Sequence, residues 1–348
     1  MTSPHFIKNW RLKKSSAFEL YTNSTAKKAI DFRLWNNSVT VYANANLSIY
    51  SAQECNAACG FCIEKLRPAS RGLQLAQQKT IELDDIKYFS NLRAVLKALR
   101  PLNPSVSITG GEPSKDPRLP GILILLQEFN CRKRTITTNG SGLFDKYDGK
   151  SILDWLIEYN IQHLNISLAH PDLTENSRLM NLHDGLNLEA LRQVTATCKN
   201  NLIRPRLSCI LLKSEIDSLA KIITYLEFAR SIGIDNVVFR ELMKSHRVAE
   251  NDYKIINFCE SRRVKLTKIL SELSNHNKFS FIKQVIGYYY YVEVWKYKNI
   301  DVLFEEADLR QLEKSKQKEP GIIHEMVFHP NATLCSTWQP WDGVLGPI

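Results

Sequence analysis

Short apolar runs alternate with stretches of helical periodicity between about residue 44 and residue 245 of the chain. The stretch "LDDIKYFSNLRAVLKALR" shows the helical pattern, because Ile86, Phe89, Leu92, Leu96 and Leu99 recur at steps of three and four residues. Runs rich in β-branched residues, such as "SVSIT", end at glycine, asparagine or other polar residues. Six strand-like runs of this kind occur, and five of them lead into a helical stretch.

Strands that alternate with helices along a chain pair in parallel, and each helix crosses over one face of the sheet. The pattern therefore predicts an α/β fold, a partial (β/α)6 barrel of the TIM-like type. In such folds the chemistry gathers at the carboxyl ends of the strands. We expect the polar residues at the strand ends to meet on one rim. The expected strand ends are residues 55–62, 110–113, 138–140, 167–170, 213 and 240–241.

The pattern changes on both sides of this block. We expect residues 1–43 to form an N-terminal extension. Within it, the pattern of "AIDFRLWNNSVTVYANA" predicts a hairpin that turns at Asn36 and Asn37. Residues 44–245 form the expected barrel. Residues 246–348 predict a C-terminal α+β extension, with a basic helical stretch followed by two hairpins that turn at "KN" and "HPNA". We expect this extension to shape a substrate pocket.

Composition indicates a globular protein. A chain of 348 residues is long enough to bury a sizeable core. No apolar run approaches the roughly 20 residues that cross a bilayer. The first residues, "MTSPHFIKNWRLKKSS", lack the apolar segment of a secretory signal. We therefore expect a cytoplasmic protein without membrane contact.

The net charge of +10 favours an acidic partner, such as a nucleotide, a phosphorylated metabolite or an acidic peptide. The basic clusters "RLKKSS", "RKR" and "SRRVKLTK" are dispersed along the chain. No adjacent set of aromatic residues accompanies them for stacking on bases. Nucleic acid is therefore not the expected partner.

Three of the eight cysteines, Cys55, Cys59 and Cys62, lie within eight residues in "ECNAACGFCIE". In a reducing compartment such a cluster indicates metal or redox chemistry. Structural zinc needs four ligands, and neither a second cysteine pair nor a nearby histidine follows. Thiol redox chemistry needs only "CGFC" and leaves Cys55 without a role. Three thiolates suit a [4Fe-4S] cluster with one open iron.

The remaining cysteines occur singly, among apolar neighbours or in helical patterns. Isolated cysteines of this kind are commonly small buried hydrophobic residues. We expect that role for Cys131, Cys198, Cys209, Cys259 and Cys335.

The stretch "CNAACGFC" resembles the CxxxCxxC signature of the radical S-adenosylmethionine (SAM) superfamily, and Phe61 stands where that family has an aromatic residue. One strand later, "TGGEP" resembles the GGE motif of the same family. The strand and helix alternation extends the likeness over the whole six-strand block. In barrel pattern the chain is most similar to members like the GTP cyclase of molybdopterin synthesis. It lacks the grouped C-terminal cysteines that would hold a second cluster.

The resemblance implies that the three clustered cysteines bind a [4Fe-4S] cluster, and that the open iron binds the amino and carboxylate groups of S-adenosyl-L-methionine. It also implies an electron donor such as flavodoxin or ferredoxin. Phe61 would lie near the adenine, and the GGE residues would line the methionine part. The implied SAM contacts are Gly110, Gly111, Glu112, Thr138, Asn139, Asn165, Ser167, Arg206 and Ser208. The polar residues among them would serve equally well as scaffold residues that bind loops.

Three further residues at strand ends are candidates for catalysis. Arg240 and Glu241 are expected to face the cavity, where an arginine suits a phosphate or carboxylate. His170 can donate or accept a proton. A structural ion pair and a solvent-exposed loop histidine are the respective alternatives.

We thus expect an enzyme that cleaves SAM reductively and abstracts a hydrogen atom from a small acidic or phosphorylated substrate, similar to a nucleotide or sugar. Two alternatives stay open. One is a radical SAM maturase that modifies a ribosomal peptide substrate. The other is a non-catalytic protein that binds an iron–sulfur cluster or zinc.

Overall fold

The computed structural model describes residues 29–43, 45–51, 54–65, 81–129, 131–244 and 253–347. Most of the predicted N-terminal extension, residues 1–28, lies outside the described residues. The predicted boundary at residue 245 lies outside them too. The division of the chain into three parts therefore stays a prediction.

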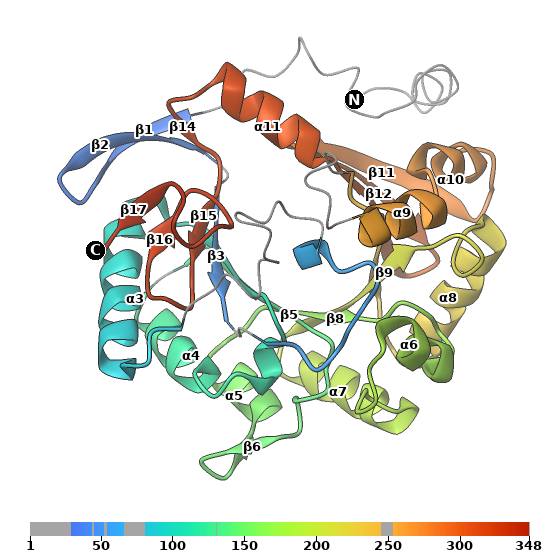
Figure 1. The fold of residues 1–348 in the computed structure, drawn as a ribbon. Helices are drawn as coiled ribbons and strands as arrows, with labels where there is room; N and C mark the ends of the chain where they lie inside the picture. The colour runs from blue at the N-terminus through green and yellow to red at the C-terminus, as the bar shows by residue number, and fades with distance from the viewer. Residues whose placement is uncertain are drawn as a thin grey trace.

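A twelve-stranded sheet forms the centre of the fold. Its middle six strands follow one another in chain order, and each neighbouring pair is parallel. Figure 1 shows helices around the outside of this curved sheet. The six strands are β3 (Asn46–Tyr50), β4 (Ser105–Thr109), β5 (Lys133–Thr138), β8 (His163–Ser167), β9 (Arg204–Leu211) and β10 (Asn236–Glu241). The structure is thus an α/β fold with a large, mainly parallel sheet, and the TIM-like (β/α)6 barrel stays the finer prediction.

Helices occupy the connections between these strands. They are α3 (Asp85–Leu99), α4 (Leu119–Glu128), α5 (Ile152–Glu158), α6 (Leu173–Met180), α7 (Leu188–Asn200) and α8 (Leu219–Ser231). A short hairpin, β6 (Lys146–Tyr147) and β7 (Lys150–Ser151), precedes α5. Five of the six helices correspond to the five predicted helical stretches. Helix α6 was not predicted, because its eight residues contain only three apolar side chains, Leu173, Leu179 and Met180.

Side-chain caps determine where several helices begin. Asp84 accepts hydrogen bonds from the backbone N–H groups of Ile86 and Lys87 at the start of α3. Ser218 accepts from Lys221 N–H, and α8 starts at the next residue, Leu219. Local hydrogen bonds of serine and aspartate thus help to fix where these helices begin.

Alternation along the parallel strands separates two faces of the sheet. In β9, Leu207, Cys209 and Leu211 are buried and belong to the main hydrophobic core, while Arg206 and Ser208, which alternate with this set, are only partly buried. Successive side chains of a strand point to opposite faces. The apolar set therefore packs under the helices. We call the other face, which carries Arg206 and Ser208, the inner face.

The C-terminal part extends the same sheet at both edges instead of forming a sheet of its own. At one edge β13 (Ile300–Ala307) pairs in parallel with β10, and β12 (Tyr290–Tyr297) and β11 (Phe279–Ile286) continue antiparallel. At the other edge β15 (Met326–Phe328) pairs in parallel with β3. The edge ends with β16 (Leu334–Cys335) and β17 (Val344–Gly346).

The described residues contain a helical stretch and both predicted hairpin turns, whereas β11, which pairs with β12 as a third strand, was not predicted. Helices α9 (Tyr253–Arg262) and α10 (Leu266–Leu273) form the basic helical stretch. The first hairpin turns at Lys298 and Asn299, between β12 and β13. The second turns at residues 329–333, between β15 and β16. One further helix, α11 (Leu309–Lys318), follows β13.

The N-terminal hairpin consists of β1 (Ala29–Leu34) and β2 (Asn37–Tyr42), and β14 (Ile322–Ile323) adds to β2 in parallel. Leu34 pairs with Asn37, so the turn lies at Trp35 and Asn36, one residue before the predicted position. Trp35 Nε1 donates a hydrogen bond to Leu345 O (2.7 Å), which fixes the hairpin to the C-terminal strand.

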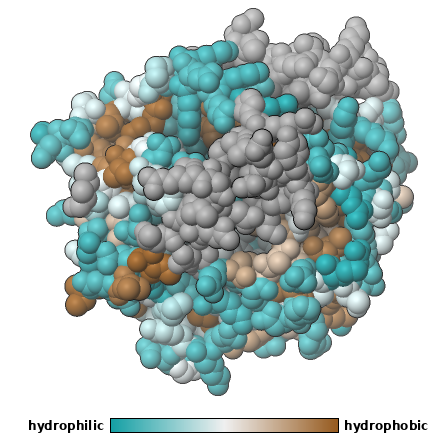
Figure 2. Space-filling view, in the orientation of Figure 1, coloured by the Kyte–Doolittle hydropathy of each residue, from teal (hydrophilic) through white to brown (hydrophobic). Residues whose placement is uncertain are grey.

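In the space-filling view of Figure 2, hydrophilic residues cover most of the visible described surface, and hydrophobic residues form separate patches. Within the described ranges, none of the helices has the length and apolar character needed to span a membrane.

Candidate active site

The loop after β3 carries the three clustered cysteines at the carboxyl end of the parallel strands. Cys55 is exposed, whereas Cys59 and Cys62 are partly buried. The N–H of Cys62 donates to Cys59 O (3.3 Å), so these two cysteines are joined by a backbone turn. None of the three forms a disulfide. We call residues 54–62 the cysteine loop.

Backbone hydrogen bonds attach the cysteine loop to two neighbouring segments. Glu54 O accepts from Glu112 N–H (2.9 Å) in the turn after β4. Ala58 N–H donates to Met180 O (3.1 Å) at the end of α6. The loop is therefore fixed on both sides of Cys55 by segments that are distant in sequence.

Asn56, between the first two cysteines, adds side-chain hydrogen bonds. Its Nδ2 donates to Ser141 Oγ (2.9 Å) and Asp184 Oδ1 (2.7 Å). Its Oδ1 accepts from Asn139 Nδ2 (2.9 Å). One exposed side chain thus joins the cysteine loop to the end of β5 and to the segment after α6.

Phe61 occupies apolar surroundings on the same loop. It packs against the buried residues Leu212, Leu242 and Cys259. At its neighbour Gly60, a Cβ would lie 3.3 Å from the ring of Phe258 on α9. The ring of Phe61 therefore lies among the ends of β9 and β10 and helix α9, and its predicted position beside the adenine stays a prediction.

The donor set of the cysteine loop fits an iron–sulfur cluster chemically. Thiolates are the ligands that such clusters take, and in a cubane each thiolate binds a different iron. The three thiols therefore need not converge on one point. Among the described residues, no group of three or more His, Cys, Asp and Glu side chains is close enough to hold a single metal ion.

The other five cysteines are all buried, as the sequence predicted. Burial raises the pKa of Cys259 and of Cys335 to about 11. Burial also raises the pKa of Cys198 to about 12. Such thiols remain protonated at neutral pH, as expected of cysteines that serve as small buried hydrophobic residues.

The turn after β4 needs glycine at Gly110, where φ is +89°. A Cβ there would lie 2.4 Å from the ring of Tyr50, which is fully buried. Tyr50 donates its hydroxyl to Glu64 Oε2 (3.1 Å) and stacks with His329. Gly111 also has a positive φ, of +58°. Packing against Tyr50 therefore explains the first glycine of the motif without a ligand.

Glu112 is only 2% exposed, and both of its carboxylate oxygens accept hydrogen bonds. Oε1 accepts from Ser114 N–H (2.9 Å), from Ser114 Oγ (2.7 Å) and from Thr138 Oγ1. Oε2 accepts from Asn139 N–H (2.7 Å). We call Asn56, Glu112, Ser114, Thr138 and Asn139 the rim network. Glu112 thereby joins the β4 turn to β5, and its contact with SAM stays a prediction.

The remaining predicted SAM contacts lie along β8 and β9. Asn165 is opposite Arg206 in the register, and Ser167 is opposite Ser208. Asn165 Nδ2 donates to Thr137 Oγ1 on β5 (3.2 Å). Alternation places all four on the inner face. The structure thus brings them together, but on a different surface from the rim network.

The inner face also carries cations that the sequence analysis did not single out. Lys133 begins β5, and His163 and Arg204 are opposite each other at the starts of β8 and β9. Arg206 Nε donates to Asn236 Oδ1 on β10. Arg204 forms an ion pair with Asp301 on β13. The alternating patterns "KRTITT", "HLNIS" and "RPRLS" contained the signal for this shared face.

Burial and the proximity of other cations lower the pKa values of three residues on this face. Burial, together with the charges of Lys133, Arg206 and Arg204, lowers the pKa of His163 to about 4. Burial lowers the pKa of Arg206 to about 10, with Arg240 and Arg204 as additional causes. Burial and the arginines also lower the pKa of Lys133.

Arg240 and Glu241, both expected to face one cavity, lie on opposite faces of β10. Arg240 is on the inner face, 3.5 Å from Glu305. Glu241 is 5% exposed and accepts from Leu266 N–H (2.8 Å) at the start of α10. Burial raises the pKa of Glu241. The positive charge of Lys244, 3.4 Å away, acts in the opposite direction. The prediction that both side chains face one cavity is therefore wrong, because neighbouring residues of a strand point in opposite directions.

His170 follows β8 and is partly buried. Its Nδ1 accepts from Asp172 N–H (3.1 Å) in the turn that leads into α6. Asp172 in turn caps α6, since its carboxylate accepts from Thr174 and Glu175 N–H. The structure thus gives His170 a local role in this turn, and its role in catalysis stays a prediction.

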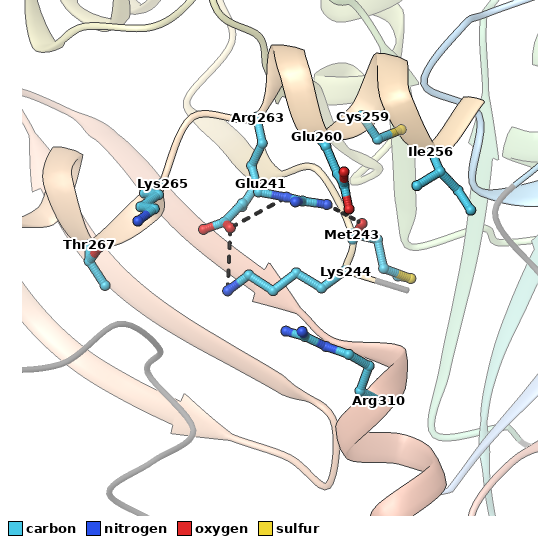
Figure 3. Close-up of a pocket in the computed structure, with 10 residues that line it drawn as sticks. All are labelled: Glu241, Met243, Lys244, Ile256, Cys259, Glu260, Arg263, Lys265, Thr267 and Arg310. Atoms are coloured by element: carbon cyan, nitrogen blue, oxygen red, sulfur yellow. Dashed lines mark hydrogen bonds and ion pairs between the residues drawn. The ribbon is translucent and has the colours of Figure 1, made fainter. Parts of the chain in front are cut away.

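A cavity of about 230 Å³ lies beside Glu241, between the end of β10, helices α9 and α10 and the start of α11 (Figure 3). Lys244 is 2.5 Å from Glu306 and is paired with Glu241. Arg310 is paired with Asp308 (2.7 Å). Acidic neighbours thus balance these cations. The cavity is lined by Glu241, Met243, Lys244, Ile256, Cys259, Glu260, Arg263, Lys265, Thr267 and Arg310.

No protein-family model matches the sequence, and no curated protein sequence matches it either. Among solved structures, the chain is similar to Streptococcus suis SuiB bound to S-adenosylmethionine, at 22% identity and a TM-score of 0.44, over 61% of this chain and 43% of that chain. It is also similar to SuiB bound to the precursor peptide SuiA, at 21% identity and a TM-score of 0.43, over 57% of this chain and 40% of that chain.

A further similar structure is coproporphyrinogen III oxidase (HemN) from Escherichia coli, described as a radical SAM enzyme, at 16% identity and a TM-score of 0.40. That match covers 66% of this chain and 52% of HemN. The chain thus spans about half, or less, of the length of the structures it matches.

Proposed function

We propose that the protein is a radical SAM enzyme in which Cys55, Cys59 and Cys62 hold a [4Fe-4S] cluster with one iron open to SAM. The observation that supports this most directly is the anchored cysteine loop. Three thiols lie at the carboxyl end of a parallel sheet, and a backbone hydrogen bond joins Glu54 to the turn of the "TGGEP" motif. Held by these cysteines, the cluster would supply one electron for reductive cleavage of SAM, and this chemistry would lead to removal of a hydrogen atom from the substrate.

The chain's own residues orient this site and exclude water from part of it. The rim network holds the cysteine loop against the ends of β4 and β5. Phe61 and its apolar neighbours Leu212 and Leu242 cover one side of the loop. Exclusion of water protects a reactive radical from side reactions. The residues beside the loop are therefore suited to radical chemistry.

For the substrate, we propose a small acidic or phosphorylated molecule, similar to a nucleotide or sugar. The net charge of +10 and the cations of the inner face support this class. A ribosomal peptide is the alternative substrate. Phosphorylated metabolites are expected to accelerate formation of 5′-deoxyadenosine, and acceleration by peptides alone would favour the alternative.

Anaerobic reconstitution with iron and sulfide tests the proposal. We expect about four irons per chain and a brown absorption band. Reduction in the presence of SAM is expected to release 5′-deoxyadenosine. Cys59→Ala should abolish both, whereas Cys131→Ala, which changes a buried cysteine outside the loop, should preserve both. Zinc in place of iron, or a cluster that never cleaves SAM, would contradict the proposal.

A further inference from the structure

Much of the inner face is polar, although Ile210 and Val238 also lie on it. Interiors of TIM-like barrels are usually filled with layers of bulky branched residues. Here one row across four neighbouring strands consists of Ser107, Thr135, His163 and Arg204. All four are only partly buried. Two short hydroxyl side chains, Ser107 and Thr135, thus lie in one row with His163 and Arg204.

The cations of this face exceed the carboxylates that neutralise them. Asp301 pairs with Arg204 and with Lys296 (2.8 Å), and Glu305 lies 3.5 Å from Arg240. Within the described part of the chain, neither Lys133 nor Arg206 takes part in an ion pair. Positive charge therefore accumulates around Arg206, in the middle of the face.

Unsatisfied polar atoms point to the same place. Asn165 is 7% exposed, and its Oδ1 is buried without a hydrogen-bond partner among the described residues. The same holds for His163 Nδ1 and Arg240 Nε. Asn165 lies opposite Arg206 in the register. Buried polar groups are normally hydrogen-bonded, so a cluster of exceptions beside unpaired cations indicates a ligand site.

We propose that the inner face binds the phosphate groups of the substrate, with Lys133 and Arg206 as phosphate ligands and Asn165 as acceptor for a neighbouring hydroxyl. Arginine matches phosphate oxygens bidentately, and lysine supplies a point charge. Because these residues precede the carboxyl ends of their strands, the phosphate lies deeper in the sheet than the cysteine loop. The carbon part of the substrate then extends towards that loop.

This orientation rests on the proposed function, but binding of the anion itself does not. A bound anion would also offset the repulsion that the surrounding cations exert on a proton at His163. The charges around His163 disfavour its protonation. A bound phosphate would favour it, so binding near pH 5.5 should be accompanied by proton uptake.

Calorimetric titration of tripolyphosphate into the protein without a cluster tests the site. Citrate serves as a carboxylate probe. We expect tripolyphosphate to bind more tightly than citrate and to take up protons, counted in two buffers of different ionisation enthalpy. Arg206→Met and Lys133→Met should each weaken tripolyphosphate binding at least tenfold. Arg206→Lys, which retains the charge, should weaken it less.

Lys146→Met provides the matched control, because Lys146 is an exposed lysine on the β6 hairpin. It should leave binding unchanged. Equal affinity in the wild type, Arg206→Met and Lys133→Met would overturn the proposal, as would tighter binding of citrate. Loss of tripolyphosphate binding in well-folded variants supports the site even where SAM cleavage fails. Conversely, 5′-deoxyadenosine formation without anion binding would contradict only the site.

Discussion

The rim network lies at the carboxyl ends of β4 and β5, two strands that also carry part of the inner face, yet the polar groups of the two regions are in opposite situations. Both carboxylate oxygens of Glu112 accept hydrogen bonds from the protein, and Asn56 bonds three neighbouring side chains. On the inner face, Asn165 Oδ1 has no partner among the described residues, and Arg206 lies near both cations and carboxylates without forming an ion pair among the described residues. Satisfied networks hold one geometry. Unneutralised charge instead favours a ligand, and the two regions therefore separate positioning from binding.

The strongest test of this comparison is Glu112→Ala. It removes the acceptor for the N–H groups of Ser114 and Asn139 and leaves those donors buried. We expect the free energy of unfolding to fall by roughly 3 kcal/mol, because several charge-assisted hydrogen bonds are lost at once. Chemical denaturation of the protein without a cluster measures it.

Glu128→Ala is the control for this experiment, because Glu128 forms a largely exposed ion pair with Arg93. Its expected cost is below about 1 kcal/mol. If Glu112→Ala denatures at the same midpoint as the wild type, the rim network does not stabilise the fold. The contrast with the inner face would then be lost.

Gly110→Ala is expected to lower the free energy of unfolding by about 2 kcal/mol. The new Cβ combines a positive φ with a position 2.4 Å from the Tyr50 ring. Gly149→Ala is a matched control, because Gly149 has a similar φ of +77° and no atom within 4 Å of its Cβ position. Thermal denaturation of both separates the backbone strain from the contact. Equal losses would show that Tyr50 does not require the glycine.

Local pattern was enough to predict much of the fold. The six parallel strands, the cysteine loop and the glycine turn each have a signal within about ten residues of sequence. Edge pairing was not predictable in this way. β13 and β15 join opposite edges of one sheet, and only tertiary packing decides where such strands pair.

The site shows the same division. The positions of Cys55, Cys59 and Cys62 followed from sequence, but the inward orientation of Glu112 depends on Thr138 and Asn139, more than twenty residues away. The opposite directions of Arg240 and Glu241 are a different case. They follow from strand periodicity alone, and the sequence analysis missed them because it treated the strand end as a single surface.

His163 provides a smaller test, on the inner face. Its folded pKa of about 4 lies below the value of 6.5 for an unperturbed histidine. Between these pH values the unfolded chain binds the proton and the folded chain does not, so stability falls as the pH falls from 6.5 to 4. His163→Asn should flatten that slope by on the order of 1 kcal/mol, because water still reaches part of the ring.

The groups facing His163 are Lys133 on β5 and Arg204 and Arg206 on β9, which stay charged throughout this range. Denaturation curves from pH 4 to 7 measure the slope. His183→Asn replaces an exposed histidine and should leave it unchanged. An unchanged slope in His163→Asn would show that the inner face does not repel a proton.

Asn56→Ala is expected to have the smallest effect on stability. It therefore distinguishes a rim network that holds the cysteine loop from one that only stabilises the fold. Asn56 is exposed, so the loss of its hydrogen bonds should lower the free energy of unfolding by less than about 1 kcal/mol. Under the proposed function, however, the cysteine loop would lose its side-chain connection to Asn139, and iron should leave a reconstituted protein several-fold faster in the presence of a chelator. Ser141→Ala removes only one of the three partners and should have an intermediate effect. Wild-type iron retention in Asn56→Ala would mean that the backbone bonds of Glu54 and Ala58 alone hold the loop, and that the rim network supports the sheet and not the cluster.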